Sequence, residues 1–184
     1  MKRSTLLIFA ALLLVKYASA DYSTEEWKIE EARRKQVFVT PSDNKTDPSL
    51  LPIHLNITFY NKHVVNPSTN QVYPGKPWLI FAFWHKCGFC VKFKPEFEEI
   101  AVKHRDIANW GYIDGVNEEY LKITYNFTSF PWIFMLKGDT IYPFLGFRNE
   151  SSLVDFITTS YNETVTKAPI PPALTYLGLQ YIYL

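Results

Sequence analysis

Cysteine is nearly absent from this sequence, which has two among 184 residues, Cys87 and Cys90. A disulfide framework needs more cysteines than this, so we expect the pair to serve chemistry rather than to staple the fold. An excess of one charge sign is also missing, because 19 basic and 18 acidic residues give a formal net charge of +1. This balance excludes the global basic field that is typical of nucleic-acid binding, and no nucleic-acid partner is expected.

Long apolar runs are missing as well, since a membrane-spanning helix needs roughly 20 apolar residues. The run from Leu6 to Val15 has ten. Two basic residues precede it, and the small residues Ala18-Ser19-Ala20 follow it, which is typical of a secretory signal peptide over residues 1–20. Its removal, with Lys2, Arg3 and Lys16, changes the formal net charge from +1 to −2.

Composition divides the rest of the chain into three parts. Residues 21–49 are predicted to form an N-terminal extension, with a surface helix over Thr24 to Val37 followed by a loop rich in proline. Residues 50–165 are predicted to form one folded domain. Residues 166–184 form an apolar, proline-containing tail, which is uncharged from residue 168 onward. The tail could dock on the domain, bind a partner or contact a membrane, and the sequence leaves these alternatives open.

Asn-X-Ser/Thr sequons support passage through the secretory pathway, where such asparagines are glycosylated. Five in a chain of this length fit a lumenal glycoprotein better than a cytosolic protein. The candidate sites are Asn44, Asn56, Asn126, Asn149 and Asn162.

The hydrophobic pattern of the central domain predicts strands separated by helices, and therefore an α/β fold with a central mixed sheet flanked by helices. A hairpin turn at Lys137-Gly138-Asp139 adds an antiparallel pair to the parallel core. Pro95 lies inside a predicted helix and should kink it. The predicted strands are 55–59, 78–84, 110–114, 132–136 and 140–145, and the predicted helices are 91–103, 118–125 and 151–161.

The two cysteines form the motif Cys87-Gly88-Phe89-Cys90, between the predicted buried strand 78–84 and the helix that follows. A cysteine at a helix N-terminus meets free backbone N–H groups and the positive end of the helix dipole, which favour a thiolate. His85 and Lys86 add protonatable or positive groups beside it and should lower the pKa of Cys87 further. A thiolate is the nucleophile of disulfide exchange, so the motif predicts a redox dithiol.

Four features together resemble a thioredoxin-like domain of the protein disulfide isomerase family, over about residues 50–161. They are the Cys87-Gly88-Phe89-Cys90 motif after a buried strand, Pro95 five residues later, the segment Tyr125 to Pro131, and Phe144-Leu145-Gly146-Phe147-Arg148.

The resemblance implies a role for each matching residue. Cys87 would attack a client disulfide, Cys90 would resolve the mixed disulfide, and Arg148 would approach Cys90 and lower its pKa. Pro131 would follow a cis peptide bond, and the backbone of Phe130 would pair with the client. These two residues and the side chain of Phe89 would form an apolar client groove. Asn126 stands where a left-handed backbone is plausible.

The sequence departs from the family pattern at three positions. Phe89 stands where the isomerases usually have histidine, and Lys86 replaces the usual tryptophan. Phe81 stands where family members commonly bury an acid that relays protons to the second cysteine, which argues against fast turnover. No KDEL-like ending is present, so the expected location is the endoplasmic reticulum lumen or the outside of the cell.

The leading hypothesis is a thiol–disulfide oxidoreductase that forms, reduces or isomerises disulfides through Cys87 and Cys90. Its expected partners are cysteine-containing secretory client proteins and glutathione or another thiol–disulfide couple; no cofactor is expected. The alternative is a thioredoxin-fold binding or chaperone module with little redox turnover. A metal site at His85, Cys87 and Cys90 is disfavoured by ligand number and geometry, and no metal is expected. Hydrolysis by Cys87 with His54, His63 or His104 has no supporting spacing.

Overall fold

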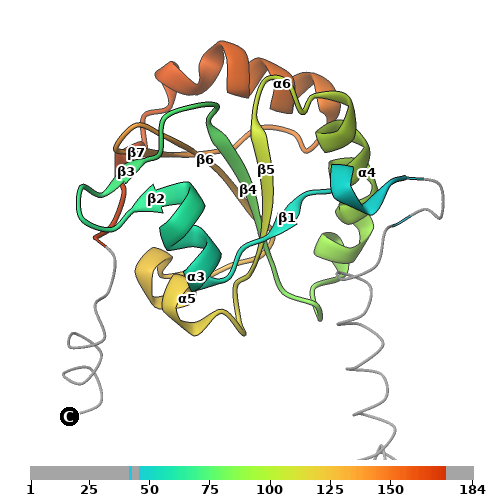
Figure 1. Cartoon of the computed structure of the whole chain (residues 1–184). Helices are drawn as coiled ribbons and strands as arrows, with labels where there is room; N and C mark the ends of the chain where they lie inside the picture. Colours follow the sequence, from blue (N-terminus) through green and yellow to red (C-terminus); the bar gives the residue numbers. More distant parts are fainter. Residues whose placement is uncertain (1–41, 43–45, 173–184) are drawn as a thin grey trace, which may run out of the picture. The chain divides into compact units, whose positions relative to one another are not determined.

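The computed structural model describes Ser42 and residues 46–172 of the chain (Figure 1). The predicted signal peptide, the predicted helix 24–37, the sequon at Asn44 and the tail from residue 173 lie outside the described residues.

A six-stranded mixed sheet forms the centre of the fold, in the order β1-β5-β4-β6-β7-β8 (Figure 1). Strands β1, β5 and β4 run parallel to one another, and β6, β7 and β8 extend the sheet through antiparallel pairs. The predicted mixed sheet is confirmed. The strands are β1 (Ile53–His54), β4 (Trp78–Phe83), β5 (Asn109–Asp114), β6 (Trp132–Lys137), β7 (Thr140–Pro143) and β8 (Ala168–Pro169).

Strand β4 lies in the middle of this sheet, and all six of its residues are buried. Because successive side chains of a strand point to opposite faces, Leu79, Phe81 and Phe83 enter one core, whereas Trp78, Ile80 and Ala82 enter the other. The parallel neighbour β5 passes close to Leu55 at Gly111, where an added Cβ would lie 2.7 Å from the Leu55 Cδ1 atom. A side chain at that position would have to displace Leu55.

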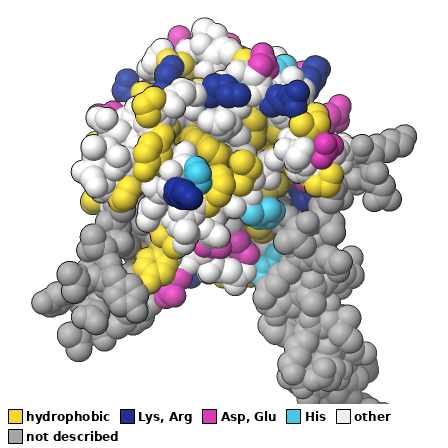
Figure 2. Space-filling view, in the orientation of Figure 1, with side chains coloured by type: hydrophobic (Ala, Val, Ile, Leu, Met, Phe, Trp, Pro, Cys, Tyr) yellow, Lys and Arg dark blue, Asp and Glu magenta, His cyan; other side chains and the backbone are white. Residues whose placement is uncertain are grey.

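Helices cover both faces of the sheet (Figure 1). Helices α4 (Gly88–Lys103) and α6 (Glu150–Thr158) pack on the face that holds Phe81, whereas α5 (Glu119–Tyr125) and the helical segment 57–64 pack on the other. Pro95 lies inside α4, which continues past it. Acidic, basic and apolar side chains are interspersed on the face shown in Figure 2.

The strand predicted over residues 55–59 is wrong. Residues Ile57–Phe59 form a short helix, α3, which continues as a π-helical turn, η2 (Tyr60–Val64). The side-chain oxygen of Asn56 accepts a hydrogen bond from the Phe59 N–H at 2.8 Å and caps this helix. The first strand is therefore limited to Ile53–His54. A small hairpin of β2 (Val65–Asn66) and β3 (Gln71–Val72) follows.

The C-terminal part also differs in detail from the prediction. The helix predicted over 151–161 is divided into α6 and a 3-10 turn, η3 (Ser160–Glu163), and a further 3-10 turn, η1 (Pro48–Leu50), precedes β1. Strand β8, in the segment predicted as tail, pairs with β7, and the next residue, Ile170, is 1% exposed. Within residues 46–172, no helix combines the length and the apolar character that crossing a membrane requires.

Candidate dithiol active site

Cys87 and Cys90 lie at the start of α4, as predicted. Cys87 is the N-cap residue: its backbone is extended, its carbonyl accepts the Val91 N–H at 3.1 Å, and its Sγ accepts the Cys90 N–H at 3.3 Å. Its own N–H donates to the Trp84 carbonyl at 2.9 Å and fixes the turn between β4 and the helix. The Cys87 sulfur is thus held where free N–H groups and the helix dipole stabilise negative charge.

Cys90 differs from Cys87 in exposure, because Cys87 is half-buried whereas Cys90 is 0% exposed. Burial is the main cause that raises the pKa of the Cys90 thiol well above its ordinary value, and the neighbouring Cys87 raises it further. A backbone hydrogen bond at Trp84 and the positive charge of Arg148 act in the opposite direction. The second thiol therefore stays protonated until something accepts its proton, and Arg148 is the charged side chain that favours its thiolate.

The segment before β6 faces the first cysteine. The Phe130–Pro131 peptide bond is cis, as predicted, and the Cys87 thiol donates to the Phe130 carbonyl with 3.6 Å between sulfur and oxygen. Asn126, at the end of α5, has φ of +49°, so the predicted left-handed backbone is confirmed as well. The Phe130 ring lies against Gly115, where an added Cβ would clash with it.

Apolar side chains around the dithiol are exposed. Phe89, between the cysteines, is 72% exposed, and Trp84, just before them, is 36% exposed. His85 is buried beside Trp84, with 6.4 Å between ring centroids, and Lys86 is half-buried. An effect of His85 and Lys86 on Cys87 stays a prediction.

The side chain of Phe81, which has no polar group, lies in the core next to α4, the helix that carries the cysteines. Its ring is 0% exposed and lies 5.5 Å from Phe93, 5.2 Å from Phe97 and 5.7 Å from Tyr112, measured between centroids. The site thus has an aromatic wall where the relatives implied by the resemblance have an acid.

A buried ion pair lies farther along the same helix, and sequence reasoning missed it. The Lys94 Nζ and Glu98 Oε1 atoms are 2.5 Å apart, and the two side chains are 1% and 8% exposed. Ser42 closes the pair, because its N–H donates to Glu98 Oε2 at 2.9 Å and its hydroxyl accepts from Lys94 at 3.0 Å. The four-residue spacing of the charges was visible in the sequence, but the same spacing is common on solvated helix faces.

The described sequons are on the surface. Asn56, Asn126, Asn149 and Asn162 are all exposed, and the side chains of Asn56 and Asn149 also cap helices through their oxygen atoms. Glycosylation takes place at the nitrogen of the amide, so the oxygen-mediated caps of Asn56 and Asn149 do not occupy the atom that would be modified. Their modification stays a prediction.

The fold and this site define a thioredoxin-type domain. Residues 57–159 match the Thioredoxin family, which is more than half of the chain, so the chain belongs to the thioredoxin family. No curated protein matches the chain.

Solved structures of thioredoxin domains share the fold. The J-Trx1 fragment of ERdj5 is similar with a TM-score of 0.52 and 22% identity over 65% of this chain and 53% of that one. The first thioredoxin domain of mouse protein disulfide-isomerase A4 is similar with a TM-score of 0.50 and 22% identity, over 74% of this chain and 96% of that one. The first two thioredoxin domains of Naumovozyma dairenensis Eps1p are similar with a TM-score of 0.51 and 15% identity, over 73% of this chain and 52% of that one. The chain spans about half the length of the ERdj5 fragment, and the resemblance predicted from the sequence is confirmed for the fold.

Proposed function

We propose that this protein is a thiol–disulfide oxidoreductase of the secretory pathway, which forms, reduces or isomerises disulfides in client proteins through Cys87 and Cys90. The observation that supports this most directly is the position of the Cys87 sulfur. It accepts the Cys90 N–H at the start of α4 and lies 3.6 Å from the Phe130 carbonyl of the cis-proline segment.

Reduction of a client would proceed in two exchanges. The Cys87 thiolate attacks one sulfur of a client disulfide, the client S–S bond breaks, and the departing client thiolate takes up a proton. Cys90 then loses its proton and attacks the Cys87 sulfur, so that the Cys87–Cys90 disulfide forms and the second client sulfur leaves as a thiolate. The client gains two electrons, and the dithiol loses two. The reverse sequence oxidises a client, and attack by another client thiol isomerises it.

Client binding and thiol ionisation would be coupled at Phe130. Its carbonyl accepts the hydrogen bond of the Cys87 thiol, and a thiolate or a mixed disulfide has no proton to donate. Ionisation of Cys87 therefore releases this carbonyl for a backbone N–H of the client. Phe89 and Trp84 offer exposed apolar surface beside it.

Arg148 would assist the resolving step. Its positive charge favours the Cys90 thiolate, whose formation burial opposes. A glutathione-type thiol–disulfide couple would return the dithiol to its starting state. The endoplasmic reticulum lumen or the cell exterior is proposed as the location, on the basis of the predicted signal peptide and sequons.

An equilibrium redox titration in glutathione buffers, followed by alkylation of free thiols, tests the proposal. The chain has no other cysteine, so alkylation reports on this pair alone. A potential near about −180 mV would support an oxidase or isomerase, and one near about −270 mV a reductase. Cys87→Ser should abolish activity on a scrambled client, while Cys90→Ser should accumulate the mixed disulfide. Unchanged activity of Cys87→Ser would contradict the proposal. So would a cysteine pair whose redox state stays the same in every glutathione buffer of the titration.

A second candidate is a binding module with little redox turnover, and the buried Phe81 ring favours it, because no acid is present there to relay protons. Client binding that survives the double substitution Cys87→Ser and Cys90→Ser, together with negligible exchange by the wild-type protein, would support this candidate. Loss of binding in the double variant would count against it.

A further inference from the structure

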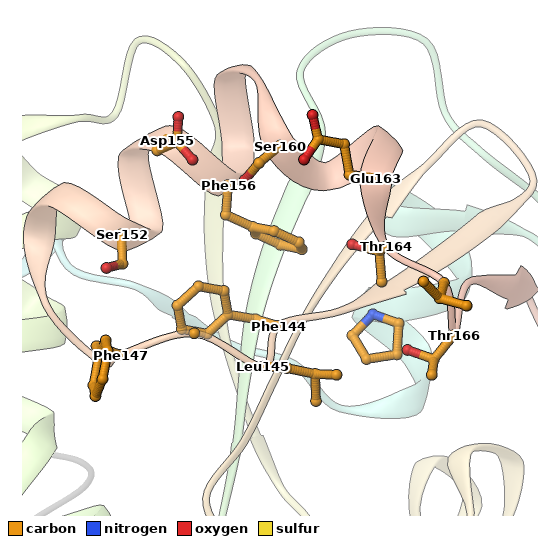
Figure 3. Close-up of a pocket in the computed structure, with 13 residues that line it drawn as sticks. Phe144, Leu145, Phe147, Ser152, Asp155, Phe156, Ser160, Glu163, Thr164 and Thr166 are labelled. Atoms are coloured by element: carbon orange, nitrogen blue, oxygen red, sulfur yellow. The ribbon is translucent and has the colours of Figure 1, made fainter.

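A groove of about 450 Å³ lies between the loop that follows β7, the helix α6 and the segment after η3 (Figure 3). It is lined by residues 143–147, by α6 and η3 side chains, and by residues 164–166. The volume falls within the range of roughly 300–1,000 Å³ that is usual for ligand sites. None of the residues assigned to the dithiol chemistry lines it.

The floor and the lower edge of the groove are apolar. The Phe144 and Phe156 rings pack edge to face on the floor, with 5.1 Å between their centroids. Leu145 and Phe147 lie along one edge in Figure 3, and they are 77% and 83% exposed; Val165, which also lines the groove, is 95% exposed. Side chains of this size are costly to leave in water, so the edge offers favourable burial to an occupant.

The opposite edge is acidic. Asp155 and Glu163 are exposed and lie on the far side of the two phenylalanine rings from Leu145 and Phe147 in Figure 3. No lysine or arginine is among the residues that line the groove, and among the described residues neither carboxylate forms an ion pair. The groove therefore has two exposed carboxylates without a salt-bridge partner among the described residues, beside an apolar floor.

We propose that this groove binds an extended polypeptide segment that carries a bulky apolar side chain next to lysine or arginine. The apolar side chain would cover Phe144 and Phe156 between the exposed edges, and the basic side chains would pair with Asp155 and Glu163. Charge complementarity selects this occupant, because an acidic segment would be repelled from the same edge. The site does not use the thiols, so it stands whichever of the two proposed functions holds.

Its position would link binding to the dithiol. Phe144 to Phe147 line the groove, and the next residue, Arg148, is the one whose charge acts on Cys90. A segment bound here would thus lie along the same loop that carries Arg148.

Peptide binding to the purified wild-type protein, measured by fluorescence anisotropy, tests the proposal. The probe is a labelled, cysteine-free peptide with a Phe-Leu pair between lysines; its comparisons carry glutamates for the lysines, or serines for Phe-Leu. We expect the lysine peptide to bind at least about tenfold more tightly than either comparison, and to weaken as salt rises. Equal binding of the lysine and glutamate peptides would overturn the proposal.

Protein variants locate the site. Asp155→Asn with Glu163→Gln should weaken the lysine peptide about threefold to tenfold, since each exposed pair contributes modestly. Leu145→Ser with Phe147→Ser should weaken it about tenfold or more. The control, Glu96→Gln with Asp106→Asn, removes the same charge from exposed residues outside the groove and should change nothing.

Three further outcomes would also overturn the proposal: undiminished binding by both groove variants, equal loss in the control variant, or a wild-type dimer in sedimentation that Leu145→Ser with Phe147→Ser disperses. The last would assign the groove to a second copy of this chain. Failure of the redox titration would leave the peptide result unaffected, so the two proposals fail separately.

Discussion

The buried pair of Lys94 and Glu98 gives the sharpest prediction about the stability of the dithiol helix. Cys90, Lys94 and Glu98 follow one another at intervals of four residues and are all buried on α4. Substitution of Lys94 by Met removes a cation that lies 2.5 Å from Glu98 Oε1 and leaves that carboxylate 8% exposed. The hydrogen bond from the Ser42 N–H to Glu98 Oε2 remains.

We expect Lys94→Met to lower the free energy of unfolding by about 3–5 kcal/mol, because it leaves a buried charge without its counter-ion. Glu98→Gln should cost a comparable amount for the same reason. The double variant removes both charges and retains an acceptor for Ser42, so it should cost only about 1–2 kcal/mol. The pair would then show a coupling of several kcal/mol in the double-mutant cycle.

Urea unfolding of the reduced proteins, followed by tryptophan fluorescence, measures these differences. The chain offers a matched control, because Lys103 and Glu150 also lie 2.5 Å apart but are 59% and 41% exposed. Lys103→Met makes the same chemical change at an exposed pair and should cost about 0.2–1 kcal/mol. Equal effects of the two Lys→Met substitutions, or additive effects of the two buried substitutions, would refute the reasoning.

Three further predictions concern the site itself. Burial raises the pKa of Cys90, so the unfolded chain releases this proton at a lower pH than the folded protein does. Above about pH 9, the unfolding free energy of the reduced protein should therefore fall relative to that of Cys90→Ala, by up to about 1.4 kcal/mol per pH unit. Urea-unfolding free energies of the two proteins that change in parallel with pH would contradict this. Arg148→Gln should slow resolution of the Cys87–glutathione mixed disulfide about threefold to tenfold in quenched-flow assays, whereas an unchanged rate would remove Arg148 from the mechanism. Gly115→Ala should displace the Phe130 ring and lower the free energy of unfolding, measured by thermal unfolding, by about 1–3 kcal/mol. Gly88→Ala places its Cβ where no atom lies within 4 Å and should lower it far less. Equal effects of the two substitutions would be inconsistent with overpacking at Gly115.

The sheet and its main helices could be predicted from the sequence because their signals are local. The six buried residues of β4 form a continuous apolar run, and the helix after the cysteines shows an apolar side of helical period. The error at residues 55–59 arose because Leu55, Ile57 and Phe59 alternate like a strand over too few residues to distinguish the two periods. The helix that forms instead is capped by a single side-chain hydrogen bond of Asn56, which the alternating apolar pattern does not reveal.

The positions of the two cysteines, the cis bond before Pro131 and the left-handed Asn126 were predictable because each belongs to a motif with a fixed place in the fold. The buried ion pair and the groove were not. Lys94 is buried and donates a hydrogen bond to Ser42, which is 52 residues away in the chain and could not be paired with it from a local pattern. The groove lies between residues 143–147 and residues 163–166, and no local sequence pattern predicts that these two segments lie close together.

The two ends of the sheet have a consequence for solubility. Strands β1 and β8 have two residues each, and β8 ends at Pro169, whose nitrogen carries no hydrogen. Two more prolines, at positions 171 and 172, follow it. Rows of unpaired backbone groups on long, flat outer strands recruit further chains into intermolecular sheets, and short outer strands with proline offer few such groups. Among the described residues, the protein therefore exposes large apolar side chains such as Phe89 and Phe147, while the short outer strands of its sheet offer few free backbone groups to another chain.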